Sequence, residues 1–312
     1  MIDPGAVRLP PDAAAAPRCG FALKGPAYML GSALLFSILG LLIKILGPQY
    51  RMWDIAVYRL LGGTLILYAI FGWQQNLFKP VYPRLMLIRG ILGTVTFLCL
   101  VVAIRSIPFS TAMAIFYSFP AFAAVIAPLL FGERISFYEI VCLFIALFGV
   151  LVLFDLQIEG HPIGLVMGVF AAVLAGLTVA IIKKLREANG SVIIYFYFCL
   201  VGSVVCLGPY LAAPTVPDNL IDGAIVGGIV ATSIVAQLLM NHGFKDCKSW
   251  EGGLYMTSEL VFTAVLGIVL LSEAVTKRFW IGAALILISA VAFQVRHRNG
   301  RPKGVLQQTD RG

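Results

Sequence analysis

Charged side chains are scarce in this chain, and that scarcity excludes an ordinary soluble protein. Only 12% of the 312 residues are Asp, Glu, Lys or Arg, and 60% are hydrophobic, whereas soluble domains carry about 25% charged residues. Histidine is scarce as well, with three residues that are far apart in the sequence, namely His161, His242 and His297. A membrane-embedded enzyme would need a cluster of acid–base or metal-binding groups near one interface, so we do not expect an enzyme.

The cysteine and glycine patterns exclude further classes. None of the six cysteines forms a CxxC pair, and most lie inside apolar runs, which predicts buried, reduced side chains and no metal site. The chain has no Walker-type glycine-rich loop, so direct use of ATP is not encoded. Rings of like charge or a filter loop, which would indicate a channel, are also missing. We expect no cofactor.

Long apolar segments dominate instead. About 20 helical residues at a rise of ~1.5 Å cross the ~30 Å hydrocarbon core of a bilayer. Ten crossings are expected, at Ala27–Leu46, Trp53–Gly72, Leu85–Ile104, Thr111–Phe131, Phe137–Phe154, Gly164–Lys183, Ser191–Leu211, Ile221–Phe244, Gly252–Leu271 and Phe279–Val295. Because the connections are short, the predicted fold is an all-α integral membrane protein in a lipid bilayer, without a soluble domain.

Lysine and arginine set the expected orientation, because cytoplasmic loops are enriched in them. With a cytoplasmic N-terminus, 16 of the 23 Lys and Arg residues fall on the cytoplasmic side and four on the other. We therefore predict that both termini lie in the cytoplasm and that the protein resides in the cytoplasmic (inner or plasma) membrane. The formal charge of +8 reports this topology and does not indicate nucleic acid binding.

The second half of the chain repeats the first. A shift of 140 positions aligns the first expected crossing with the sixth, the third with the eighth, the fourth with the ninth and the fifth with the tenth. Each repeat then has five crossings, and an odd number places the second repeat upside down relative to the first. Inverted repeats are typical of secondary transporters, which bind substrate near the midplane between the repeats.

Four domains follow from this repeat. Residues 1–25 are predicted to form a cytoplasmic N-terminal tail, 26–155 the first repeat, 160–296 the second repeat, and 297–312 a basic cytoplasmic tail. The sequence leaves a homodimer open.

Several short motifs resemble those of a known family. They are Tyr58-Arg59-Leu60, Ile88-Arg89-Gly90, Arg105-Ser106-Ile107-Pro108, Pro120 and Gly132-Glu133. In order and spacing they are similar to the drug/metabolite transporter superfamily, in particular its ten-helix members built from two EamA-type repeats. The resemblance runs from about Pro26 to Phe293 and departs from the pattern at Leu260 and Ser272. It implies a carrier for amino acids, vitamins, nucleoside-like compounds or drugs that works by alternating access.

Two charged residues lie deep in the expected crossings, where a charge usually faces a cavity or a partner. Glu259 is interpreted as a proton-coupling carboxylate or as a counter-ion for a cationic group on the substrate. The alternative is a buried structural carboxylate, neutral or paired with Arg59 or Ser258. Arg59 itself either faces the cavity or reaches outward to the membrane surface. For Arg89, close to a membrane face, reaching outward is the preferred interpretation.

Uncharged polar residues in the segments complete the expected binding site. Gln237 and Asn241 are four apart and share one helical face, where they suit either a polar substrate or hydrogen bonds between helices. Tyr117, Ser118 and Pro120 gather near the middle of the fourth crossing, where proline frees a backbone carbonyl for the cavity or only kinks the helix. Ser37 and Thr178 are expected to line the cavity with hydroxyls, and Tyr255 to stack on a planar substrate.

The prediction from sequence is therefore a secondary active transporter of a small organic metabolite, with protons as a further partner. A facilitator or exchanger without proton coupling, and a membrane scaffold that transports nothing, are the alternatives.

Overall fold

The computed structural model describes residues 24–47, 49–107, 109–132, 135–153, 162–271 and 277–299, which form twelve α-helices and no strand. The helices are α1 (Lys24–Ile45), α2 (Met52–Phe71), α3 (Pro83–Ser106), α4 (Phe109–Phe116), α5 (Phe119–Phe131), α6 (Phe137–Leu153), α7 (Pro162–Arg186), α8 (Ser191–Leu211), α9 (Leu220–Gly243), α10 (Ser249–Met256), α11 (Ser258–Leu271) and α12 (Lys277–Asn299). Pro108, Glu133, Ser272 and both predicted terminal tails, apart from a few residues next to α1 and α12, lie outside the described residues.

The helices coincide with the ten predicted crossings, except that the fourth and the ninth crossings each contain two consecutive helices. Helices α1, α2, α3, α7, α8 and α9 are long and apolar enough to cross a membrane, and α5, α6 and α12 contain shorter apolar stretches. The prediction of an all-helical membrane fold is thus confirmed for the part of the chain that is described.

The first interruption lies between α4 and α5, at Tyr117 and Ser118. A proline inside a helix clashes with the carbonyl four residues earlier and lacks an N–H. In the first turn of a new helix it costs nothing, because that N–H would have no partner there. Pro120 occupies this early position in α5, and the Ser118 hydroxyl donates to the Ile115 carbonyl at 2.6 Å.

The second interruption, between α10 and α11, has no proline. Thr257 stands there, and its hydroxyl donates to the Leu254 carbonyl at 2.7 Å, a local bond that competes with the regular helical ladder. Helices α4 and α10 are both eight residues long and begin 140 positions apart, at Phe109 and Ser249. The interruption therefore recurs at the same place in both halves of the chain.

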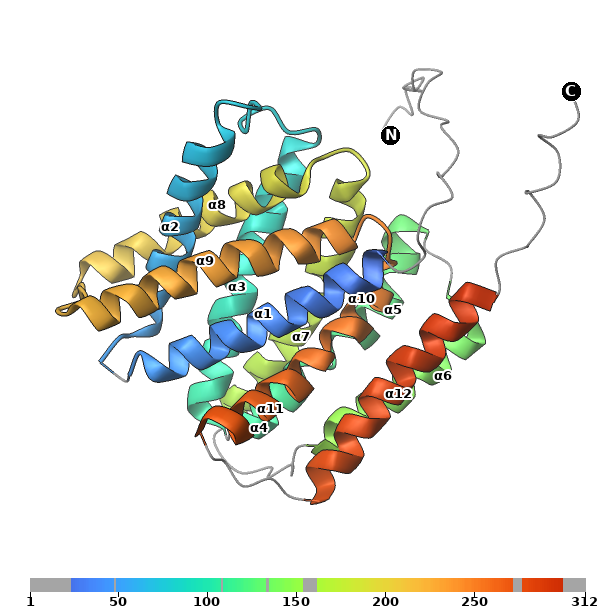
Figure 1. Ribbon diagram of the computed structural model, residues 1–312. Helices are drawn as coiled ribbons and strands as arrows, with labels where there is room; N and C mark the ends of the chain where they lie inside the picture. Colours follow the sequence, from blue (N-terminus) through green and yellow to red (C-terminus); the bar gives the residue numbers. More distant parts are fainter. Residues whose placement is uncertain are drawn as a thin grey trace, which may run out of the picture.

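Figure 1 shows how the helices pair across the two halves. Helix α1 runs beside α9, α3 packs on α7, and α2 packs on α8. Helices α6 and α12 lie side by side at one edge of the bundle and pack mainly against each other. The start of α1 and the end of α12 lie toward the same end of the bundle. Each of these pairs joins a helix of the first half to one of the second.

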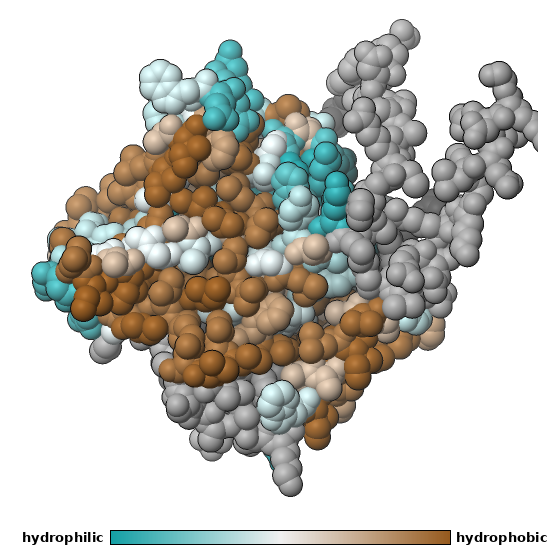
Figure 2. Space-filling model, in the orientation of Figure 1, coloured by the Kyte–Doolittle hydropathy of each residue, from teal (hydrophilic) through white to brown (hydrophobic). Residues whose placement is uncertain are grey.

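The face of the molecule in Figure 2 is rich in apolar side chains, which form a broad brown area over the helices. Exposed residues of this kind occur on most of the outer helices, for example Leu65 on α2, Leu129 on α5, Phe148 on α6, Val204 on α8 and Ile288 on α12. A soluble monomer rarely exposes such a large apolar area, whereas lipid chains cover it without cost. The surface is that of a multi-pass membrane protein.

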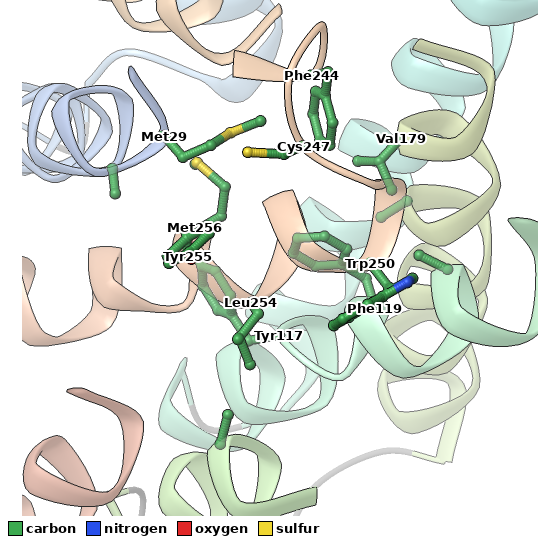
Figure 3. Close-up of a cluster of buried hydrophobic side chains, with 14 of the residues drawn as sticks. Met29, Tyr117, Phe119, Val179, Phe244, Cys247, Trp250, Leu254, Tyr255 and Met256 are labelled. Atoms are coloured by element: carbon green, nitrogen blue, oxygen red, sulfur yellow. The ribbon is translucent and has the colours of Figure 1, made fainter. Parts of the chain in front are cut away.

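The largest buried cluster lies where the interrupted helices meet (Figure 3). It includes Met29 from α1, Phe119 from α5, and Trp250 and Met256 from α10. Helices α5 and α10 cross closely, since a Cβ atom added to Gly253 would lie 2.9 Å from the Phe119 ring. The burial predicted for the cysteines is confirmed for the five that are described, Cys99, Cys142, Cys199, Cys206 and Cys247.

Candidate functional site

A cavity of about 260 Å³ lies inside the bundle, next to the interrupted helices. Every helix except α6 and α12 contributes at least one of the described residues that line it. Most of the lining is apolar and includes five phenylalanines, Phe36, Phe97, Phe116, Phe119 and Phe198. The polar lining residues are Arg59, Arg89, Thr96, Tyr117, Thr178, Gln237 and Glu259. Few polar groups in a mostly apolar cavity are typical of a small-molecule site.

Glu259 lies in the first turn of α11 and faces the cavity. The positive end of the helix dipole favours a carboxylate at this position. The hydroxyl of Tyr117, at the first interruption, donates a hydrogen bond to that carboxylate, so the site joins the two repeats. Ser258 is not the partner of Glu259, because the Ser258 hydroxyl is buried without a hydrogen bond. The cavity-facing interpretation of Glu259 agrees with this geometry.

Arg59, on α2, also lines the cavity. Its Nε donates to the Ser233 hydroxyl of α9 at 2.6 Å, and its guanidinium carbon lies 5.9 Å from the centre of the Phe36 ring on α1. Ser233 is in turn within 3.1 Å of the Tyr195 hydroxyl. These contacts hold Arg59 inside the bundle and not at the membrane surface. No ion pair within 4 Å joins Arg59 to Glu259 in the described part of the chain.

Arg89, on α3, contradicts the prediction that it reaches outward. Only 3% of its surface is exposed, and it lines the same cavity as Arg59 and Glu259. The prediction used depth alone, and depth does not say which side of a helix faces the bundle. Helical spacing did carry a signal, because Arg89 shares one face of α3 with Gly93, Thr96 and Leu100.

Two of the predicted hydrogen-bonding residues reach the cavity. Gln237, on α9, and Thr178, on α7, are both buried and both line the cavity. The Thr178 hydroxyl has no hydrogen-bond partner. Asn241 shares a helical face with Gln237 but does not line the cavity. Its Nδ2 donates to the Ser191 carbonyl of α8 at 3.3 Å, so it links two helices.

Four more predicted residues do not line the cavity. The Ser37 hydroxyl is buried and donates to the Leu34 carbonyl of its own helix at 2.6 Å. Ser118 bonds within the first interruption, as described above, and Pro120 packs against Gly253 of α10. Tyr255 is 2% exposed within the cluster of Figure 3. Ser118, Pro120 and Tyr255 belong to the interrupted helices next to the cavity, and Ser37 bonds within α1. The geometry gives none of the four a surface for substrate.

The arrangement suits reversible binding of a small amphipathic molecule. Two guanidinium groups and one carboxylate face a chamber whose walls are mainly rings and thioethers. Within the described residues, no group of three His, Cys, Asp or Glu side chains is close enough to hold a metal ion.

The sequence matches the EamA-like transporter family twice, over residues 23–155 and 162–293. The pseudopaline exporter CntI of Pseudomonas aeruginosa (strain UCBPP-PA14) is 23% identical over 258 residues, covering 82% of this chain and 91% of its own. An S-adenosylmethionine uptake transporter of Rickettsia bellii is 21% identical and covers 84% and 90% respectively. Human solute carrier family 35 member G1 is 22% identical and covers 85% and 77%.

A solved crystal structure has the same fold, with a TM-score of 0.75 at 18% identity. It covers 89% of this chain and 99% of its own. These proteins are similar to this chain over most of its length.

Proposed function

Because the chain belongs to the EamA-like transporter family, and with it to the drug/metabolite transporter superfamily, we propose that it is a secondary active transporter. It moves a small organic metabolite, such as an amino acid, a vitamin, a nucleoside-like compound or a drug, across the cytoplasmic membrane. The observation that carries the proposal is the cavity with its inward-facing Glu259. The related proteins named above are themselves described as transporters or solute carriers.

The proposed architecture is ten crossings in two inverted repeats, near residues 26–155 and 160–296. Each repeat corresponds to one of the two family matches. The recurrence of the helix interruption after 140 positions supports this division. Five crossings in each repeat reverse the direction of the second, which is the arrangement of alternating-access carriers.

Helix packing supports the same symmetry. Exchanging the repeats turns the α1–α9 contact into the α7–α3 contact, and both are among the most extensive in the bundle. The same exchange turns the α5–α7 contact into the α11–α1 contact, which is also present. Contacts that are equivalent in the two repeats can swap their conformations when the protein opens to the other side. We propose that this swap is the rocking motion of transport.

Orientation and coupling complete the proposal. Both termini lie in the cytoplasm, on the argument from the distribution of Lys and Arg. Glu259 binds a proton during the cycle, and its carboxylate lies beside the Tyr117 hydroxyl. A carboxylate between the repeats can make the change of access depend on its protonation. The transporter would then use the proton gradient as its energy source.

The test is transport by purified protein in liposomes, with and without an imposed pH gradient. A panel of labelled metabolites is offered to the wild type, to Glu259→Gln and to Glu187→Gln, which removes an exposed carboxylate. We expect the gradient to accelerate transport by the wild type and Glu187→Gln, and Glu259→Gln to keep only the part that does not depend on the gradient. If the gradient accelerated all three equally, the carboxylate of Glu259 would be structural and not the coupling group. If it accelerated none of them, the protein would be a facilitator or exchanger without proton coupling. Transport of no compound at all would favour a scaffold.

A further inference from the structure

The most unusual group in the cavity is the Arg89 guanidinium. Its Nε and Nη1 atoms are buried and have no hydrogen-bond partner. In the described residues no carboxylate lies within 4 Å of it. A buried charge without a partner is strongly destabilising, so a protein retains one only where another interaction compensates. Arg89 therefore points to a ligand that carries a hydrogen-bond acceptor.

The surroundings of Arg89 are built to hold the guanidinium in place. Its central carbon lies 4.6 Å from the centre of the Phe198 ring of α8, which favours a cation above the ring face. Gly93, one turn further along α3, leaves room for it, because a Cβ atom there would lie 2.3 Å from Nη1. Neither contact satisfies the N–H groups, which leaves them available for an acceptor.

The charges of the cavity define that acceptor. Arg59 and Arg89 carry two positive charges, and among the described residues that line the cavity only Glu259 is acidic. Arg59 already donates its Nε to Ser233, and Glu259 already accepts from Tyr117. One positive charge thus remains unbalanced when Glu259 is ionised. We assign it to Arg89, whose Nε and Nη1 have no hydrogen-bond partner. A single negative charge on the ligand would balance it.

We infer that Arg89 is the binding site for a substrate carboxylate, which makes the substrates small carboxylates with an apolar body. This inference rests on the proposed transport function and specifies its substrate class. A planar carboxylate matches the forked N–H groups of a guanidinium and forms two charge-assisted hydrogen bonds with it. The apolar body lies against the phenylalanines and methionines of the chamber, whose volume of about 260 Å³ admits a molecule of amino-acid size.

The experiment compares matched compounds in one transport assay. Liposomes containing the purified protein are loaded with a mixture of phenylalanine, tryptophan, methionine, 3-phenylpropanoate and 4-methyl-2-oxopentanoate, together with the primary amide of each. Efflux is followed by mass spectrometry. The wild type is expected to release carboxylates at least about tenfold faster than the corresponding amides, the loss expected for a charge-assisted hydrogen bond.

Three variants assign the effect to Arg89. Arg89→Gln is expected to reduce carboxylate efflux by about ten- to a hundredfold, and Arg89→Lys, which keeps the charge without the fork, to be intermediate. Arg84→Gln is the matched control, because Arg84 is exposed on the same helix, and it should behave as the wild type. Equal efflux of acids and amides, or full activity of Arg89→Gln, would overturn the inference and leave the transporter proposal intact.

A second loading separates the two proposals when the mixture does not move. Liposomes are then filled with a small-molecule cell extract. If only compounds that lack a carboxylate are released from the extract, the inference is overturned and the transport function stands. Release of nothing from either loading overturns the transport function and the inference together.

Stability distinguishes a binding residue from a structural one. Arg89→Met keeps an unbranched apolar side chain as far as the position of Nε and removes the unpaired charge. Without substrate, its apparent melting temperature in detergent should equal or exceed that of the wild type, because no hydrogen bond is lost. A fall of several degrees would show that Arg89 supports the fold and would count against a binding role.

Discussion

The two described ion pairs between residues three apart provide a quantitative test of burial. Arg51 and Asp54 approach to 3.0 Å at the start of α2, where the Asp54 side chain is 0% and the Arg51 side chain 35% exposed. Lys184 and Glu187 approach to 2.5 Å at the end of α7, with 40% and 55% exposed. The shorter pair is therefore the more exposed one. Distance and burial then predict opposite answers to which pair contributes more to the free energy of unfolding.

Burial should decide the ranking. Asp54 accepts from the Arg51 backbone N–H at 2.8 Å and from Nε and Nη2 of its side chain at 3.2 and 3.0 Å. Asp54→Asn keeps one acceptor and removes the charge. Breaking a fully buried pair costs 3–5 kcal/mol, and because water still reaches Arg51 we expect about 2 kcal/mol. Glu187→Gln should cost about 0.3–0.5 kcal/mol, as exposed helical pairs do.

The assay is unfolding by SDS in mixed micelles, followed by tryptophan fluorescence. Trp250 is fully buried, so its emission reports loss of the core. Both variants keep the size of the side chain they replace, so the comparison isolates the charge. If Glu187→Gln destabilised the protein as much as Asp54→Asn, distance would outweigh burial and the reasoning would be wrong.

Three further predictions concern helix contacts and access. Gly93→Ala should push the Arg89 guanidinium out of its position and lower carboxylate efflux at least about tenfold, at a cost of 1–3 kcal/mol in unfolding free energy; efflux and SDS unfolding measure both. Gly176→Ala places a Cβ 2.8 Å from the Ala123 backbone nitrogen, where α5 and α7 cross, and should cost about 2 kcal/mol or more in the same unfolding assay. Burial raises the pKa of the Cys247 thiol, in the turn before α10, so at neutral pH less of it is thiolate and maleimide should modify it at least about tenfold more slowly than free cysteine.

The positions of the membrane segments were predictable because hydrophobicity is a local property. A run of apolar residues is apolar whatever it packs against, so in the described part of the chain each predicted range is helical, with a break in the fourth and in the ninth. The first interruption was predictable from a local signal, because Pro120 indicates a break or kink in the helix. The second interruption has no such signal in the sequence. Thr257 stands where no proline marks the sequence, and threonine occurs in many continuous helices, so its bond to Leu254 became visible only in the structure.

The cavity was predictable only in part, because it depends on which way each helix turns. Glu259 was recognised from the cost of a charge at its depth, and that reasoning does not require a known neighbour. Its partner Tyr117 lies 142 positions away, so their hydrogen bond depends on the packing of the two repeats. The same depth argument was wrong for Arg89. It treated a position near the membrane face as an outward one, whereas Gly93 and Phe198 draw the side chain inward.

The two interrupted crossings have a consequence for how the chain is made. Eight residues of helix cover only about 12 Å, so neither α4 nor α10 can cross a bilayer alone. An exposed break in the lipid would leave polar backbone groups without partners. Helix α5 packs on α7, which is synthesised later, so α7 can cover the break beside α5 only after α7 has been made. Helices α10 and α11 pack on α5 and α1, which already exist when they emerge. The two interrupted segments therefore differ in one respect: a packing partner of α5 is synthesised after it, whereas these partners of α10 and α11 are synthesised before them.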